Sequence, residues 1–163
     1  MHHLFAVFSF LSAVNLEPDE LHILHLGVSQ YCLGSILYLL VFVVLEGSAK
    51  DNLEVVWHAI MNHYTARNTP IQYTNFQLSY FVNTKATHST YPCLKGRGAE
   101  VKGLAEALAT AWADLAPRFG PRGDTWRVTA QQALDALVDM QMLIGDWRGE
   151  AFMAMEAADL LRD

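Results

Sequence analysis

The chain has 163 residues, 52% of them apolar and 17% charged, which excludes a disordered protein and predicts a single domain, 1–163, around one core. The formal net charge of −6 argues against DNA binding by this chain alone, because phosphate contacts need a basic surface. Since so few side chains are charged, we expect some apolar surface to face a protein partner, a missing domain of a longer chain, or lipid.

The N-terminal segment 1–14 is almost wholly apolar and reads as a buried strand or helix. A signal peptide would begin with positive side chains, whereas this segment has only His2 and His3. The two cysteines, Cys32 and Cys93, form no CxxC pair, which favours a reducing compartment. The sequence does not fix the localisation, and these features favour a nuclear or cytoplasmic protein over a membrane protein.

A long apolar helix is predicted over residues 17–45, either continuous or broken near Gly27 or Gly34. Pro18 suits the first turn of such a helix, and Gly47 follows its last apolar residue, as expected of a terminating glycine. The stretch 26–45 reaches the roughly 20 residues that a membrane span requires. A buried core helix and a membrane anchor are therefore both open interpretations of this segment.

Two amphipathic helices are predicted in the middle of the chain from apolar residues spaced three and four apart, one that starts after Ser48 or Asp51 and runs to about 67, and one at about 99–115. Ser48 or Asp51 can cap the first helix, which Asn68-Thr69-Pro70 should end. The expected buried positions are Leu53, Val56, Trp57, Ile60, Met61 and Tyr64 in the first helix, and Val101, Leu104, Ala105, Leu108, Ala111, Trp112 and Leu115 in the second.

The segments around these helices are less regular. Residues 71–82 could form a short strand or begin a helix, and the prolines and glycines of 117–124 predict a flexible linker. A final helix should follow, divided near Gly145, with Val128, Ala133, Leu134, Leu137, Val138 and Met142 as its packing stripe. The sequence thus predicts a mainly α protein, an irregular bundle of about five or six helices.

Few side chains are placed for chemistry. Asp19, His22 and His25 lie three residues apart, so a helix brings at most two of them together, and no other segment supplies an obvious third metal ligand. A hydrogen bond that braces the helix is the simpler role for the Asp–His pair. We predict no metal site, no cofactor and no catalytic residue. Lys95, Arg97 and Lys102 form a possible basic contact patch.

One segment resembles a known family. Residues 15–27, Asn-Leu-Glu-Pro-Asp-Glu-Leu-His-Ile-Leu-His-Leu-Gly, resemble the D-x-x-H segment of CACTA (EnSpm, Tnp2-like) eukaryotic transposases, with Asp19 and His22 at the motif positions. The segment 91–101 looks like a second block found downstream in such proteins. The resemblance implies the helical insertion of an RNase H-like catalytic domain. It also implies two catalytic aspartates upstream of the motif, yet Asp19 is the first aspartate of this sequence.

Together these features predict a transposase-derived helical fragment, or a domesticated remnant, without a complete catalytic site. Metal-assisted phosphoryl transfer needs several carboxylates around two divalent ions, so we expect no enzyme activity. The expected role is structural, or the binding of a protein partner. The alternative is a small helical membrane or organelle-complex subunit anchored by 26–45. A stand-alone enzyme is a third class.

Overall fold

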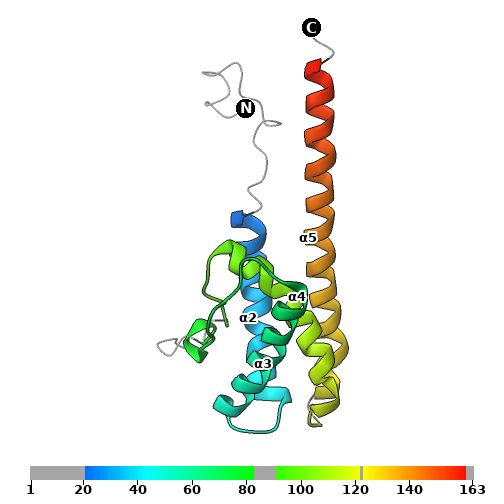
Figure 1. Ribbon diagram of the computed structural model, residues 1–163. Coiled ribbons are helices and arrows are strands. Elements are labelled where there is room, and N and C mark those ends of the chain that lie inside the picture. Colours follow the sequence, from blue (N-terminus) through cyan, green and yellow to red (C-terminus); the bar gives the residue numbers. More distant parts are fainter. Residues whose placement is uncertain (1–20, 83–90, 122, 161–163) are drawn as a thin grey trace, which may run out of the picture.

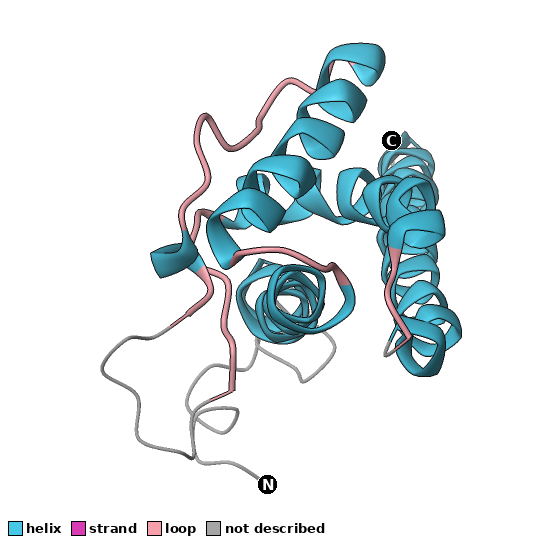
Figure 2. Ribbon diagram, turned by 90° about the horizontal axis from the view of Figure 1, so that it is seen from below, coloured by secondary structure: helices cyan, strands magenta, loops and turns pink. Residues whose placement is uncertain are grey.

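The computed structural model describes residues 21–82, 91–121 and 123–160 (Figure 1). Within these ranges, side chains are described from residue 24 to residue 146. Four α-helices follow one another, α2 (Gln30–Leu39), α3 (Ala49–Arg67), α4 (Gly98–Leu115) and α5 (Gly123–Leu160). The expected mainly α class is confirmed. The described residues form four α-helices, whereas five or six were expected. Seen from below in Figure 2, the described part of the chain consists of helices and loops.

The helix containing α2 is continuous from Leu21 to Val44, because α2 is extended by π-helical turns, η2 (Leu21–Ser29) and η3 (Leu40–Val44). Gly27 and Gly34, where a break was considered, both lie inside this helix. Its inner side chains form the centre of the core, and Leu33, Leu37 and Leu40 are fully buried. The helix packs against α4 through η2 and against α3 through η3.

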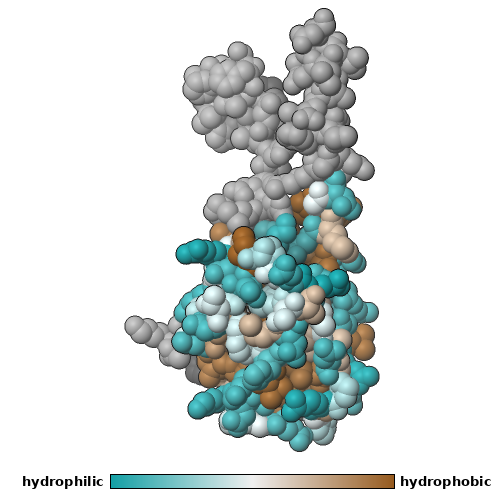
Figure 3. Space-filling view, viewed as in Figure 1, coloured by the Kyte–Doolittle hydropathy of each residue, from teal (hydrophilic) through white to brown (hydrophobic). Residues whose placement is uncertain are grey.

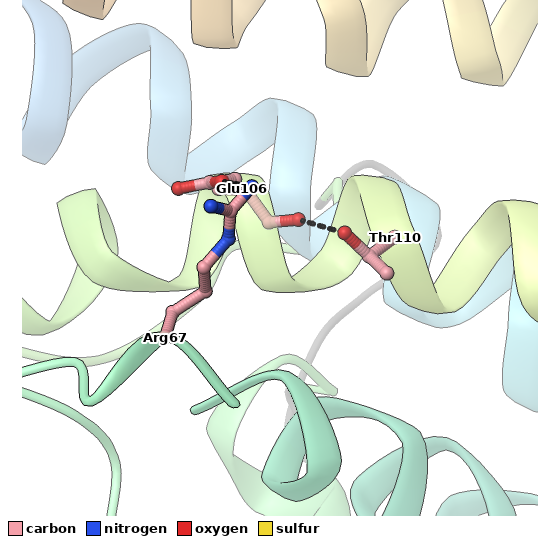
Figure 4. A network of polar contacts seen from close by, with 3 residues as sticks. All are labelled: Arg67, Glu106 and Thr110. Carbon is pink, nitrogen blue, oxygen red and sulfur yellow. Dashed lines mark hydrogen bonds and ion pairs between the residues drawn. The ribbon is translucent and has the colours of Figure 1, made fainter. Parts of the chain in front are cut away.

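Helix α3 begins and ends as the sequence predicts. Ser48 is the N-cap, and its hydroxyl oxygen accepts a hydrogen bond from the backbone N–H of Asp51 at 3.3 Å. At the other end Asn68 adopts the left-handed conformation, with φ 51°, that commonly closes a helix. Arg67, in the last turn, forms an ion pair of 3.2 Å with Glu106 of α4, whose backbone carbonyl accepts the Thr110 hydroxyl (Figure 4).

Helix α4 crosses the middle of the bundle and packs against α3, α5 and η2. The seven residues predicted to be buried on this helix are all buried in the structure. Small residues let the neighbouring helices approach, since Ala105, Ala107 and Ala111 are fully buried among larger side chains. Trp112 joins α4 to α5, because its indole N–H donates a hydrogen bond to the Arg127 carbonyl at 3.2 Å.

The strand considered for 71–82 is wrong, because this segment forms a single 3₁₀ turn, η4 (Leu78–Tyr80), between irregular stretches. Its aromatic side chains pack onto α3 instead of pairing the backbone with a neighbouring strand. Phe76 stacks on Trp57 with ring centroids 5.6 Å apart, and Tyr73 meets Phe76 edge-on at 5.2 Å. Local hydrogen bonds, such as Val82 N–H to the Leu78 carbonyl at 2.8 Å, close the turn at the end of this segment.

The segment 117–124, expected to be a flexible linker, makes defined contacts where it is described. Its first two residues belong to a 3₁₀ turn, η5 (Ala116–Arg118). The Gly120 N–H donates to the Val44 carbonyl at 2.9 Å, and Phe119 forms an antiparallel bridge with Leu45. These contacts place the start of α5 beside the end of η3.

Helix α5 is not divided at Gly145, contrary to the prediction, and its 38 residues run without interruption. A single glycine costs a helix only about 1 kcal/mol, and the residues around Gly145 favour helix. In Figure 1, α5 continues well beyond the level at which α2 and α4 end.

The packing stripe predicted for α5 is partly wrong. Leu134 and Leu137 are buried as expected, but Val128 and Met142 are 62% and 57% exposed. Ala133 is also exposed, and Ala130 is buried in its place. Because α5 carries apolar residues on most of its circumference, the spacing alone did not identify the inner face.

Candidate functional site

Of the two residues of the D-x-x-H motif, only His22 belongs to the described part of the chain. Asp19 is outside the described residues, so the expected hydrogen bond with His22 stays a prediction. The backbone of His22 belongs to η2. One turn further on, His25 is 3% exposed, on the helix that packs against α4. His22 and His25 therefore both belong to the helix Leu21–Val44, which we call the central helix.

The three basic residues proposed as a contact patch lie close to the start of α4. Lys95, Arg97 and Lys102 all have exposed side chains. Glu100 lies among them and accepts a hydrogen bond from the Arg97 backbone N–H at 2.8 Å, which closes the first turn of α4. A carboxylate in the middle of the patch reduces its positive potential. Among the described residues, no group of three or more His, Cys, Asp or Glu side chains is placed to hold a metal ion.

The most distinctive surface is on the outer side of the central helix. We call it the aromatic stripe, and it consists of Val28, Tyr31, Tyr38 and Phe42. These side chains are 56%, 54%, 38% and 40% exposed, in the order of the sequence. The rings of Tyr38 and Phe42 lie against each other, with centroids 4.8 Å apart.

The aromatic stripe is uncharged along its whole length, because no Asp, Glu, Lys or Arg occurs between Glu20 and Glu46. The side chains on the opposite side of the same helix are buried in the core. Large side chains held by a rigid backbone lose little conformational freedom on binding, and aromatic residues dominate the energetics of protein interfaces. The stripe has the chemistry of a contact surface for another apolar surface.

A neighbouring segment, 91–94, lies along the central helix beside the stripe. The Leu94 N–H donates to the Gln30 carbonyl at 2.9 Å, and the Cys93 thiol contacts Gln30 Oε1 at 4.0 Å. Close approach requires Gly34, since a Cβ there would lie 2.8 Å from the Leu94 backbone nitrogen. Tyr91, at the start of the segment, is 81% exposed and adds another aromatic ring to the surface.

Neither cysteine has the character of a nucleophile. Burial raises the pKa of the Cys32 thiol above its ordinary value. Burial also raises the pKa of Cys93, although a hydrogen bond with Tyr31 and the charge of Lys95 oppose the rise. A raised thiol pKa lowers the fraction of reactive thiolate at neutral pH. We infer that both side chains serve packing.

An open hollow of about 370 Å³ lies between the end of α4 and the start of α5. Trp112, Arg127 and Gln131 are among the side chains that line it. The guanidinium of Arg127 lies 3.9 Å from Asp124, so its charge is partly neutralised. Because this hollow is open and carries little net charge, it has few features that would hold a ligand. The aromatic stripe is therefore the stronger candidate site.

No protein-family model, curated protein or solved structure matches this chain.

The aromatic stripe is not recognisable as a surface from the sequence alone. Its residues are spaced three, seven and four apart, a spacing that places them on one side of a helix. The signal was hidden because the inner residues of the same helix are equally apolar. Only the packing of α3 and α4 shows which side faces the core.

Proposed function

We propose that this chain is a transposase-related helical module that acts by binding a protein partner through the aromatic stripe. The observation that carries the proposal is the two-sided character of the central helix. Leu33, Leu37 and Leu40 are fully buried on one side, whereas Tyr31 and Phe42 are about half exposed on the other. The partner would meet a surface that already has its bound shape.

The resemblance of residues 15–27 to the D-x-x-H segment is the basis for the transposase part of the proposal. Genomic sequence upstream of the Met1 codon tests it. An open reading frame that encodes two further acidic motifs supports a transposase ancestry, and a region without such a frame counts against it. As a test for catalysis, a nuclease assay with Mg²⁺ or Mn²⁺ should show no activity. Activity that Asp19→Ala abolishes would contradict the proposal.

Partner binding is tested with a photo-crosslinking amino acid in place of Tyr38, in the full chain and in cells of its source organism. We expect a discrete cross-linked protein, which should be lost when Phe42 is changed to Gln in the same chain. The matched control carries the photo-crosslinker at Ile71, which is 52% exposed and lies outside the stripe. Equal cross-linking from Tyr38 and Ile71 would refute a specific contact at the stripe.

A second candidate function, a helical membrane subunit, has one specific observation in its favour. Residues Leu24–Val44 form a helix that is long and apolar enough to cross a bilayer, although the central helix of a bundle passes the same test. Insertion into lipid would uncover the residues that pack on this helix. The fully buried side chains of α3 and α4, such as Ile60 and Leu104, would each lose about 1.5–3 kcal/mol of burial free energy if they became exposed to water.

Fractionation separates the two candidates. Release of the chain by carbonate extraction supports the protein-binding module, and retention until detergent is added supports the membrane subunit. The Tyr38→Gln, Phe42→Gln double variant is a control that tests whether the fold depends on the aromatic stripe. In the protein-binding module it should leave the circular dichroism spectrum unchanged, because both side chains are partly exposed and lie outside the core.

A further inference from the structure

A second surface lies on an exposed flank of α5, and it is independent of the proposed function. With 3.6 residues per turn, Ala136, Met140 and Leu143 lie on one side of this helix, roughly opposite the buried Leu134. Met140 and Leu143 are 36% and 68% exposed. Figure 3 shows brown, hydrophobic surface along this part of α5. We call these three residues the outer ridge.

A row of carboxylates borders the outer ridge. Asp135, Asp139 and Asp146 are exposed and lie on the flank next to it, at spacings of four and seven residues. Asp135 accepts a hydrogen bond from Gln131, an uncharged neighbour, at 2.7 Å. Along Gly123–Leu160 the sequence has seven carboxylates and two arginines, Arg127 and Arg148.

Among the described residues, α5 is longer than the helix α4 that packs against it. Its 38 residues correspond to about 57 Å, against about 27 Å for the 18 residues of α4 that accompany it. An apolar ridge at spacings of three and four is the pattern by which one helix packs along another. The small side chain of Ala136 permits close approach of a second backbone.

The charge pattern selects the kind of partner. Two copies of α5 facing each other would bring their aspartate rows together, and like charges at such a contact are unfavourable. A helix with an apolar face bordered by lysine or arginine would place opposite charges beside the same row. We propose that the outer ridge of α5 binds a basic amphipathic helix of a partner protein.

The test uses the full chain and a fluorescent peptide of about 18 leucines and lysines, with leucines three and four residues apart. The control peptide has glutamate in place of lysine. Fluorescence anisotropy should show at least tenfold tighter binding of the basic peptide. Leu143→Gln should weaken that binding on the order of tenfold, because it removes exposed apolar contact area without touching the core.

Matched charge variants locate the site. Asp139→Asn with Asp146→Asn should weaken binding of the basic peptide roughly fivefold, because two charge pairs at the border are lost. Glu54→Gln with Asp114→Asn removes the same net charge from α3 and α4 and should leave binding within about twofold of the parent. Circular dichroism verifies that each variant is folded, and Met140→Gln replaces Leu143→Gln if that variant is not.

Three results would overturn the proposal. The two peptides could bind equally, or both charge pairs of substitutions could weaken binding by the same factor, which would indicate only long-range attraction. Sedimentation of the chain alone could also show a dimer that Leu143→Gln dissociates. In that case a second copy, and not a basic partner, occupies the outer ridge.

Discussion

The side-chain amide of Asn52 donates a hydrogen bond to the backbone carbonyl of Val41 at 2.8 Å, from one turn inside α3 to the end of the preceding helix. The same amide lies 3.2 Å from the Leu45 carbonyl and 3.4 Å from that of Gly47. Asn52 is 5% exposed. The last carbonyls of a helix have no partners within it. Asn52 binds the Val41 carbonyl at the helix end, beside the Val44 carbonyl that accepts from Gly120, and it fixes the turn to α3.

Asn52→Ala should therefore destabilise the fold by about 1–3 kcal/mol, because it leaves buried carbonyl oxygens without a donor. Asn52→Asp should cost more, since a carboxylate would face the carbonyl oxygens as a second acceptor. Urea denaturation followed by circular dichroism measures both. An unchanged midpoint for Asn52→Asp would show that the amide does not hold this turn.

Gly34 and Gly145 are both inside helices, and alanine should have opposite effects at the two positions. At Gly34 a Cβ would lie 2.8 Å from the Leu94 nitrogen and 3.1 Å from the Cys93 carbonyl carbon, which are backbone atoms. Gly34→Ala should destabilise by about 1–3 kcal/mol, as overpacking does. At Gly145 nothing lies within 4 Å, so Gly145→Ala should stabilise α5 by up to about 1 kcal/mol.

Thermal melts of the two glycine variants provide an internal control, because each substitution adds the same methyl group to a helix. We expect the melting temperature to fall for Gly34→Ala and to rise or stay unchanged for Gly145→Ala. The same direction of change in both would contradict the close contact between the central helix and segment 91–94.

Tyr73 gives a prediction for alkaline pH. Its hydroxyl donates to the Lys95 carbonyl at 3.0 Å, and burial, with the nearby charge of Glu100, raises its pKa above the ordinary value of 10. A raised pKa means that folding favours the neutral phenol. This contribution to stability is complete below pH 10 and is lost as the pH rises above 10 towards the folded-state pKa.

Urea denaturation of the parent chain and of Tyr73→Phe at pH 8 and pH 11 tests this effect. At pH 8 the variant should be less stable by about 1 kcal/mol, because the hydrogen bond to Lys95 is gone. The loss of stability between the two pH values should be smaller in the variant, which has no phenol to ionise at this position. Equal losses in both proteins would show that Tyr73 does not contribute to the alkaline transition.

The ion pair between Arg67 and Glu106 should contribute little. Both side chains are more than half exposed, and water screens such pairs to about 0–1 kcal/mol. Arg67→Gln should therefore shift the urea midpoint only slightly, and 0.5 M salt should remove most of the difference. A loss on the order of 2 kcal/mol would mean that Arg67 has a structural role beyond this pair.

Local signals predicted the parts of the fold that depend on neighbouring residues. Ser48 before an amphipathic run, and Asn68 before Pro70, gave the bounds of α3 because capping is decided within one turn. The buried face of α4 followed from its spacing, because Lys102, Glu106 and Thr110 mark the opposite, exposed side.

Features that depend on tertiary contacts were not predictable in the same way. Asn52 looks like an ordinary polar residue in the sequence, since its main acceptor is eleven residues upstream. The inner faces of the central helix and α5 were ambiguous because both helices are apolar on several sides. The irregular segment 71–82 has the composition of a strand, but it packs through its aromatic rings, and Phe76 stacks on Trp57 of α3.

The hydrogen bonds from Leu94 to Gln30 and from Gly120 to Val44 have a consequence for synthesis on the ribosome. The central helix leaves the ribosome first, yet α4, which covers it, begins at Gly98. At 5–20 residues per second, translation from Val44 to Gly98 takes roughly 3–10 s. During that interval an uncharged helix lacks its cover, so nascent chains should depend on chaperones at this stage more than the finished protein does.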